Sequence, residues 1–303
     1  MHRFFRSLHP YSTRAASNYN GNIHKRMNQS RTISCSIPRI DVPSLSLASE
    51  ASHLKAVHET LEANGVLQLQ LGFADPESNY LENLVHHLHI NHQHGLPINH
   101  SAERGWFWDV RPCINAEHLK YQARSETMHK FDWHTDCSYE ERPPKYFALQ
   151  VLQPDRCGGG VLSVLDVDRL LRMLSPFAQK WLAGNNYRIN VPPEFIKEAG
   201  EDHIVGNLLL AKPEGQSGSQ LRLRVDITVP LTNDAAKALE ELKQTLWGDA
   251  VGEEILHLSP NDLPQGSIIV MNNRRWLHSR NEVKDPGRHL RRIRWDARPF
   301  GAT

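Results

Sequence analysis

The stretch Trp133-His134-Thr135-Asp136 is the point from which the rest of the sequence is best interpreted. Residues two apart on a β-strand point to the same face, so His134 and Asp136 would present an imidazole and a carboxylate side by side. Taken alone, this pattern also fits a strand whose alternate residues happen to be polar. A second stretch, Gly266-Ser-Ile-Ile-Val-Met-Asn-Asn-Arg-Arg-Trp-Leu-His278, offers a further imidazole. Two His and one Asp are the ligand set of facial non-haem Fe(II) sites, which leave coordination positions open for co-substrate and O₂.

Composition narrows the class of protein. A chain of 303 residues suffices for one large or two small domains. It has no run of 18 apolar residues, so we expect no membrane span. A net charge of +1 gives no electrostatic case for nucleic-acid binding. The cysteines lie far apart without C-x-x-C spacing, which fits unpaired thiols in a reducing compartment better than disulfides or a zinc site; they are Cys35, Cys113, Cys137 and Cys157.

The N-terminal residues differ in charge from the remainder. Residues 1–40 contain seven Lys or Arg and no Asp or Glu, so 28 basic and 34 acidic residues remain for the rest. A basic, acid-free start predicts a mitochondrial transit peptide, and Arg31-Thr-Ile-Ser-Cys-Ser36 resembles a processing signal. The alternative is a disordered basic tail of a cytoplasmic protein. We predict that residues 1–37 form this leader or tail and that residues 38–303 form a single domain.

Four features together resemble the Fe(II)/2-oxoglutarate-dependent dioxygenases of the taurine dioxygenase type, which include clavaminate synthase-like and γ-butyrobetaine hydroxylase-like enzymes. The resemblance covers residues from about 38 to 299. It implies a mainly β fold, a double-stranded β-helix (a cupin-like jelly roll) flanked by α-helices. The many short strands, without β-α-β alternation, favour the same fold. The features are Trp133-His-Thr-Asp136, Pro143-Pro144 with Cys157-Gly-Gly-Gly160, Asn273-Arg-Arg-Trp-Leu-His278 and Arg288-His-Leu-Arg-Arg292.

The resemblance also implies roles for two arginines in the last of these stretches. Arg288, ten residues after His278, aligns with the Arg that binds the distal carboxylate of 2-oxoglutarate in the family. Arg292 aligns with the Arg that holds the sulfonate of taurine, which implies a substrate with an anionic group. Guanidinium suits this task because it binds carboxylates bidentately. The alternative for this Arg-rich strand is a solvated basic face.

Other predictions concern the surroundings of the metal. The glycine run lacks the patterns of phosphate-binding loops, so we predict a tight turn. Taurine dioxygenase places a Thr after its paired glycines to bind 2-oxoglutarate; this chain has Val161 there, and we expect Ser163 to substitute. Tyr139 and Arg124 are predicted to contact the substrate, with buried packing as the alternative for Tyr139. Thr135 should point into the second layer, and Cys137 to the opposite face of the strand.

The remaining segments follow ordinary periodicities. Six histidines between His86 and His100 could hold a metal, but a solvated helix end is preferred because no carboxylate is paired with them. The patterns predict helices over 49–64, 76–89, 168–182 and 232–247, and strands over 36–42, 65–71, 105–111, 145–152, 187–191, 206–210, 221–226, 267–271 and 288–296.

These features predict an Fe(II)- and 2-oxoglutarate-dependent dioxygenase. It would use O₂ to oxidise, most simply to hydroxylate, an unactivated C–H of a small anionic or amino-acid-like substrate, releasing succinate and CO₂, with ascorbate as a possible means of keeping iron reduced. The rivals are a non-oxygenase metal protein, such as a hydrolase or isomerase, and a silent jelly-roll binding module. Nucleic-acid demethylation is disfavoured because residues 41–303 are net acidic. Desaturation, cyclisation and demethylation use the same cofactor and stay open as alternatives to hydroxylation.

Overall fold

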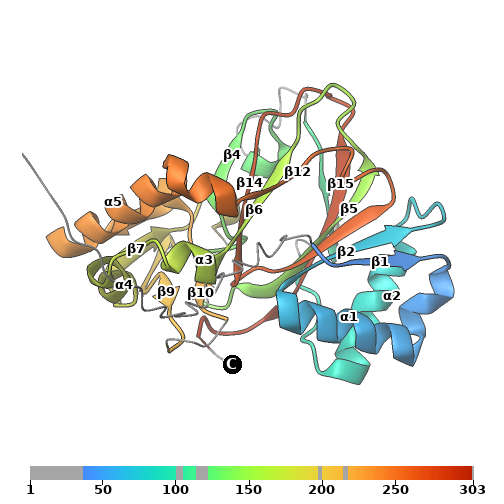
Figure 1. Ribbon diagram of the computed structural model, residues 1–303, viewed down its shortest axis with the longest axis horizontal. Coiled ribbons are helices and arrows are strands. Elements are labelled where there is room, and N and C mark those ends of the chain that lie inside the picture. The colour runs from blue at the N-terminus through green and yellow to red at the C-terminus, as the bar shows by residue number, and fades with distance from the viewer. Residues whose placement is uncertain (1–36, 100–104, 114–121, 197–199, 214–217, 302–303) are drawn as a thin grey trace, which may run out of the picture. The chain divides into compact units, whose positions relative to one another are not determined.

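The computed structural model describes residues 37–99, 105–113, 122–196, 200–213 and 218–301. They lie within the compact unit Ser36–Thr303 (Figure 1). The predicted leader, except for Ile37, falls outside the described residues, and so does the prediction of mitochondrial targeting. Among the described helices, none is long and apolar enough to cross a membrane.

The larger sheet is assembled from strands that are distant in sequence. Its order is β1-β2-β13-β5-β15-β3, and every pairing is antiparallel except that of β1 with β2. The predicted mainly β fold is therefore confirmed, and its sheets are largely antiparallel. The strand bounds are β1 Arg39–Val42, β2 Val66–Leu71, β13 Ser267–Asn272, β5 Pro144–Gln153, β15 His289–Ala297 and β3 Phe107–Val110.

The smaller sheet carries the segments that the sequence marked as important. Its order is β12-β6-β14-β4, with every neighbouring pair antiparallel. Two minor sheets, β11-β7-β8 and β10-β9, lie beyond it. The bounds are β12 Leu256–Leu258, β6 Leu162–Asp166, β14 Trp276–Arg280, β4 Phe131–His134, β11 Thr228–Pro230, β7 Tyr187–Asn190, β8 His203–Gly206, β10 Gln220–Leu221 and β9 Leu209–Leu210.

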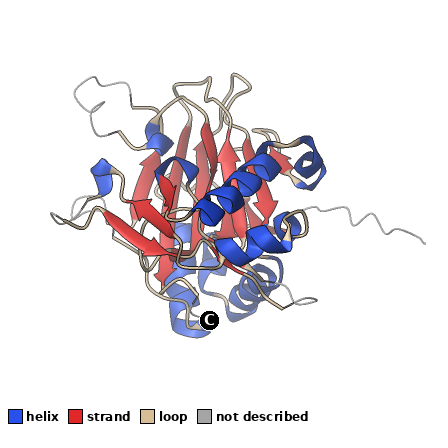
Figure 2. Cartoon of the chain, turned by 90° about the vertical axis from the view of Figure 1, so that its left-hand side faces the viewer, coloured by secondary structure: helices blue, strands red, loops and turns tan. Residues whose placement is uncertain are grey.

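Helices lie on the outer side of the larger sheet, next to β1 and β2 (Figure 1), and other helices lie in front of the strands when the molecule is seen from the left-hand side of that view (Figure 2). α1 (Ala51–Asn64) and α2 (Asn79–His92) bury their apolar stripes against the larger sheet, in one core cluster with Ile293 and Trp295 of β15. α1 ends at Gly65, whose φ of +70° places it in the left-handed region. A Cβ there would lie 2.7 Å from the indole nitrogen of Trp276, so the helix end and β14 approach too closely for any other residue.

The helix predicted over 168–182 is wrong in one respect, because two helices occupy the segment. α3 (Val167–Leu171) is capped by Asp166, since its carboxylate accepts from the Arg169 N–H at 3.1 Å. α4 (Pro176–Leu182) begins afresh after Ser175, whose hydroxyl accepts from the Ala178 N–H. Pro176 has no N–H to continue a helix but fits its first turn. α4 packs with α5 (Asn233–Trp247). Short 3₁₀ turns occupy Leu45–Ser49, Arg124–Glu126, Pro193–Phe195, Val225–Ile227 and Asp249–Glu254.

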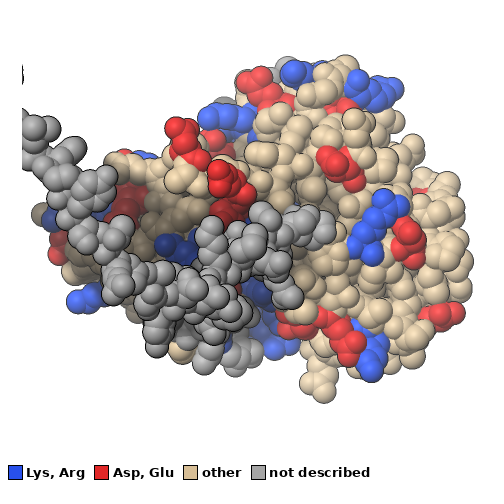
Figure 3. Space-filling view, viewed as in Figure 1, with Lys and Arg blue, Asp and Glu red and all other residues tan. Residues whose placement is uncertain are grey.

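Successive side chains of β15 alternate between the two faces of the larger sheet. Arg292 pairs across the sheet with Trp108 and Leu149, and these three share one face. Arg291 lies on the other face, where its Nε donates to Asp109 at 2.9 Å. A single Arg-rich strand thus contributes both to the space between the two sheets and to the outer surface. On the face shown in Figure 3, basic and acidic side chains are interspersed.

Candidate metal centre

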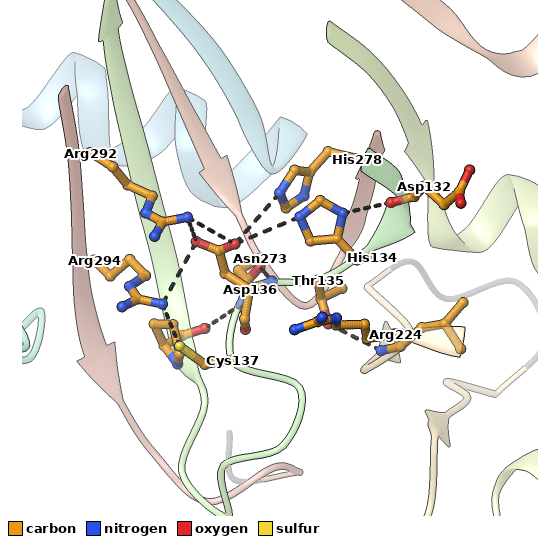
Figure 4. A network of polar contacts seen from close by, with 12 residues as sticks. Asp132, His134, Thr135, Asp136, Cys137, Arg224, Asn273, His278, Arg292 and Arg294 are labelled. Atoms are coloured by element: carbon orange, nitrogen blue, oxygen red, sulfur yellow. Dashed lines mark hydrogen bonds and ion pairs between the residues drawn. The ribbon is translucent and has the colours of Figure 1, made fainter. Parts of the chain in front are cut away.

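The smaller sheet brings the three predicted ligands to one point (Figure 4). β4 ends at His134, and the register places His278 of β14 directly opposite it. The Nε2 atoms of both rings lie 3.8 Å from Asp136 Oδ1. One ligand atom from each residue lies within 4.8 Å of the others, and all three side chains are buried.

The protonation states around this cluster fit a metal. His134 Nδ1 lies 2.7 Å from the Asp132 carbonyl oxygen, which can only accept, so Nδ1 carries the hydrogen and Nε2 keeps its lone pair. Burial, reinforced by His278, holds the pKa of His134 well below its usual value. Burial alone would raise the pKa of Asp136, but Arg292 and His278 lower it well below its usual value. Neutral imidazole and ionised carboxylate are the forms that bind Fe(II).

Asn273 holds the metal-binding turn and was not found from the sequence. Its Oδ1 accepts from the Asp136 N–H at 2.7 Å. Its Nδ2 donates to the carbonyls of Asp136 at 2.9 Å and Pro144 at 3.0 Å. The side chain is fully buried, so it fixes the backbone of the carboxylate ligand from behind. The only signal was its position in the Asn-Asn pair that precedes His278, and such pairs also occur in ordinary turns.

The two neighbours of the ligands are placed differently from each other. Thr135 faces the second layer, as predicted, where its Oγ1 accepts from the Leu223 N–H at 3.1 Å. The expected orientation of Cys137 is wrong, because the strand ends at His134 and Cys137 adopts a φ of +54°. Its Sγ therefore accepts from Arg294 Nη1 at the wall of the same site.

One pocket extends from the metal cluster between the two sheets. Arg288 lies in its wall, 5% exposed, and its Nη1 has no hydrogen-bond partner. Burial, helped by nearby Arg280, lowers the pKa of Arg288 to about 9, although Asp155 opposes the shift. Arg280 forms no ion pair among the described residues; its Nη2 donates to the carbonyls of Thr127 and His129. Apolar residues that line it include Phe147, Leu149, Val151, Leu162, Ile269 and Leu290.

The glycine run forms a turn packed against the segment that delivers Arg288. A Cβ on Gly160, whose φ is +66°, would lie 2.8 Å from Arg288 Nε. The carboxylate of Asp155 joins the two segments: Oδ1 accepts from the N–H groups of Cys157 at 2.8 Å and Gly159 at 3.1 Å, and Oδ2 from those of Lys284 at 2.7 Å and Asp285 at 3.1 Å. The prediction of a tight turn near the metal fits this arrangement.

Ser163 is not brought to the pocket, so the expectation that it binds the co-substrate is wrong in geometry. In the ladder between β6 and β14, Val164 pairs with His278 and Ser163 pairs with Ser279. Directly paired residues share a face, so Ser163 points away from the metal. Its hydroxyl lies 2.7 Å from His257 Nδ1 on the outer side. Leu162, two residues before Val164, lines the pocket instead.

A second pocket lies on the other side of His134 and Asp136. Arg292 is 8% exposed there, and its Nη1 lies 3.1 Å from Asp136 Oδ2. Tyr139 is buried and stacks on Phe195 with ring centroids 5.5 Å apart. Arg124 is half-buried, and its Nη2 lies 3.9 Å from Asp226 Oδ2. The polar and aromatic lining comprises Arg124, Ser125, Phe131, Tyr139, Phe195, Arg224, Arg292 and Arg294. The structure thus places all three predicted substrate contacts around one cavity.

A separate His/Glu cluster does not fit a metal. His58, Glu62 and His94 offer ligand atoms within 4.8 Å of one another, so the histidines are not all solvated as expected. However, the Trp295 indole N–H donates to His94 Nδ1 at 3.1 Å. The hydrogen of the neutral His94 ring must then lie on Nε2, which donates to His58 Nδ1 at 3.0 Å. A nitrogen that carries hydrogen cannot bind a metal, so this is a hydrogen-bonded chain.

The sequence is similar to that of a known oxygenase. No family model matches the sequence. The chain is 28% identical over 195 residues to an L-asparagine oxygenase of Streptomyces coelicolor, and the match covers 64% of this chain. It covers 54% of the relative, so the match spans about half of that protein's length.

Solved structures share the fold. Asparagine oxygenase in complex with Fe(II), 2S,3S-3-hydroxyasparagine and succinate superposes with a TM-score of 0.62 and 18% identity, over 86% of this chain and 93% of the other. The non-heme iron oxygenase OrfP in complex with Fe and alpha-ketoglutaric acid superposes with a TM-score of 0.61 and 17% identity, over 82% of each chain. The predicted resemblance to Fe(II)/2-oxoglutarate-dependent oxygenases is confirmed by the sequence match together with this fold.

Proposed function

We propose that this chain is an Fe(II)- and 2-oxoglutarate-dependent dioxygenase that hydroxylates an unactivated C–H bond of a small, amino-acid-like carboxylate. One observation carries the proposal: the buried cluster of His134, Asp136 and His278 opens into a pocket that ends at Arg288, a buried guanidinium. The L-asparagine oxygenase match and the neighbours bound to iron, alpha-ketoglutaric acid or hydroxylated amino acids support the same class. We further infer that the two sheets form a double-stranded β-helix.

The metal would be held by His134 Nε2, His278 Nε2 and Asp136. When bound, Fe(II) with 2-oxoglutarate and O₂ supplies the oxidation that converts the co-substrate to succinate and CO₂ and places one oxygen atom on the substrate. The chain contributes the ligand geometry. The carbonyl of Asp132 fixes the tautomer and orientation of His134, and Asn273 fixes the backbone of Asp136.

Arg288 would bind the distal carboxylate of 2-oxoglutarate. A charged guanidinium buried without an acidic partner is costly, and a bound carboxylate compensates that cost through two charge-assisted hydrogen bonds. With a pKa of about 9, Arg288 remains charged at neutral pH. The apolar residues between Arg288 and the metal cluster would exclude water from the co-substrate.

Arg292, Tyr139 and Arg124 would orient the substrate in the second pocket. Arg292 lies beside the metal ligand Asp136, so a substrate carboxylate at its free face would stand next to the metal. Tyr139 with Phe195 would form an apolar wall, and Arg124 would meet the substrate from the exposed side.

The test is anaerobic. We would mix the purified protein with Fe(II) and 2-oxoglutarate and record the weak visible charge-transfer band of the chelate. The band is expected in the wild type, absent in His134→Ala, and shifted to much higher 2-oxoglutarate concentration in Arg288→Ala. Arg291→Ala is the matched control, because this neighbouring arginine faces the outer side and pairs with Asp109.

Two results would contradict the proposal. Iron binding without a band at any 2-oxoglutarate concentration would favour the non-oxygenase metal protein. Absence of iron binding would favour the silent binding module. If the band appears, screening of small carboxylates and amino acids for substrate-dependent succinate formation follows, with ascorbate present to keep iron reduced.

A further inference from the structure

Arg280 shares the inner face of β14 with the metal ligand His278. Residues two apart on a strand point to the same side, so the two side chains stand one above the other, with Cα atoms roughly 7 Å apart along the strand. The pairing with β6 agrees, since Arg280 lies opposite Leu162, two residues before the partner of His278. The register with β4 shifts between the two residues, so that Arg280 lies opposite Phe131 and His278 lies opposite His134. All of these residues line the pocket between the metal cluster and Arg288.

The guanidinium of Arg280 is buried, and its hydrogen-bonding capacity is only partly used. The side chain is 8% exposed. Nη2 donates to the carbonyls of Thr127 and His129, whereas Nε is buried without a partner. Within the described parts of the chain, no carboxylate forms an ion pair with it. Its bonds to neutral carbonyls orient the group but leave its charge uncompensated.

Arg288 lies in the same pocket, and its guanidinium is likewise buried without a carboxylate partner among the described residues. Among these residues, its Nη1 has no hydrogen-bond partner either. The nearest acid in the lining is Asp155, but four backbone N–H groups already occupy its two oxygens. Two buried cations that face one cavity repel each other, and a single anion between them would relieve both the repulsion and the desolvation.

We propose that Arg280 is a second co-substrate-binding residue, which contacts the distal carboxylate of 2-oxoglutarate together with Arg288. This inference rests on the proposed function. Arg280 lies two residues after the third metal ligand on β14, roughly 7 Å along the strand. A five-carbon dicarboxylate that binds the metal through its keto-acid end would extend over a similar distance. The two guanidiniums would approach the carboxylate from different segments, Arg280 from β14 and Arg288 from the residue just before β15. A co-substrate without the distal carboxylate would gain nothing from either.

The experiment compares two keto acids by anaerobic titration of the charge-transfer band. The probes are 2-oxoglutarate and 2-oxobutyrate, which chelates in the same way but lacks the distal carboxylate. Arg280→Met should weaken 2-oxoglutarate binding by about tenfold to a hundredfold, the usual range for a lost hydrogen bond to a charged group, and should leave 2-oxobutyrate unchanged. Arg280→Lys, which keeps the charge but loses the planar fork, should give an intermediate affinity. Arg291→Met, on the outer face, is the control and should bind both keto acids like the wild type.

The outcomes separate this inference from the proposed function. Equal weakening of both keto acids in Arg280→Met would mean that Arg280 only supports the turn at Thr127–His129, and it would overturn the inference. If Arg280→Met does not fold, Arg280→Lys decides: a wild-type preference for 2-oxoglutarate over 2-oxobutyrate in a variant that has lost the fork overturns it. A wild type that gives no band with either acid contradicts the proposed function itself.

Discussion

Asp136 shows how much of a metal site lies outside its ligands. Its carboxylate faces two imidazoles and Arg292, while its backbone is fixed by the side chain of Asn273. The sequence predicted the ligands because His-x-Asp is a local pattern whose geometry follows from the strand alone. It did not predict Asn273, because the bond to Asp136 joins residues that are 137 positions apart.

Replacement of Asn273 should therefore damage both stability and metal binding. Asn273→Ala removes the hydrogen bonds to the Asp136 N–H and to two carbonyls, and a buried group left unsatisfied costs about 1–3 kcal/mol. We expect a clearly lower free energy of unfolding in urea and weaker Fe(II) binding. Asn83→Ala, at an exposed helix position, should change neither. A variant at Asn273 with wild-type affinity for Fe(II) would show that the turn holds its shape without the amide.

Ser163 is a residue that the sequence predicted in the pocket and that the structure places outside it. Its type and its distance from the glycine run suited a co-substrate contact, but the face on which it lies is decided by the register between β6 and β14. A shift of one residue in this register would exchange the two faces. The sequence contains no local signal for that register, so a pocket residue and an outer residue were indistinguishable.

Among the elements, the turn after β5 connects two distant segments. Burial raises the pKa of Asp155, but the backbone N–H groups of Lys284, Gly159, Asp285 and Cys157 more than reverse this, so its pKa lies below the usual value. A carboxyl whose pKa is lowered by folding stabilises the fold above its unfolded pKa, near 4, and this stabilisation is lost as the pH falls through the folded value.

Asp155→Asn should remove this part of the pH dependence. At neutral pH the variant should be less stable, by about 1–3 kcal/mol, because an amide cannot accept from all four donors. Between pH 5 and pH 3 its free energy of unfolding should fall less than that of the wild type, measured in urea at several pH values. A parallel decline of the two proteins would mean that other carboxylates dominate acid unfolding.

The sequence largely predicted which segments form helices, but it predicted less well where a helix ends and another begins. Helical periodicity marked both α1 and α5 within a few residues, because their buried stripes extend over several turns. The segment 168–182 kept an apolar period through Ser175-Pro176, where the chain ends one helix and caps the next. Period alone favoured one helix, and the Ser-Pro pair was the signal that should have divided it.

For the whole molecule, the order of the strands was not predictable from the sequence. β13 lies between β2 and β5, and β15 lies between β5 and β3. These pairings join strands that are far apart in the sequence, so no local pattern encodes them. The many short strands and the family resemblance indicated the fold class, but not this order. The same long-range pairing places His278 next to His134 and converts separated motifs into one site.

The contact between the helices and the larger sheet predicts a second acid sensitivity. His94 lies at this contact, stacked on Tyr146 of β5 and bonded to Trp295 of β15. Burial, followed by the repulsion of His58, lowers the pKa of His94 to about 4, although Asp296 and Glu62 oppose the shift. A histidine with an ordinary pKa near 6.5 binds protons more readily when the chain is unfolded. Its contribution to stability is therefore complete above pH 6.5 and is lost as the pH falls towards 4.

One pKa unit corresponds to ~1.4 kcal/mol, so protonation of His94 in the unfolded chain should lower the free energy of unfolding by up to about 3 kcal/mol between pH 7 and pH 4. In His94→Gln, which keeps a donor and an acceptor but does not titrate, the loss over this range should be smaller by a similar amount, even though the variant starts less stable. His86→Gln, at an exposed position of α2, is the control and should follow the wild type. Urea unfolding at half-unit pH steps measures all three. If His94→Gln declines as steeply as the wild type, the acid sensitivity of this contact arises from groups other than His94.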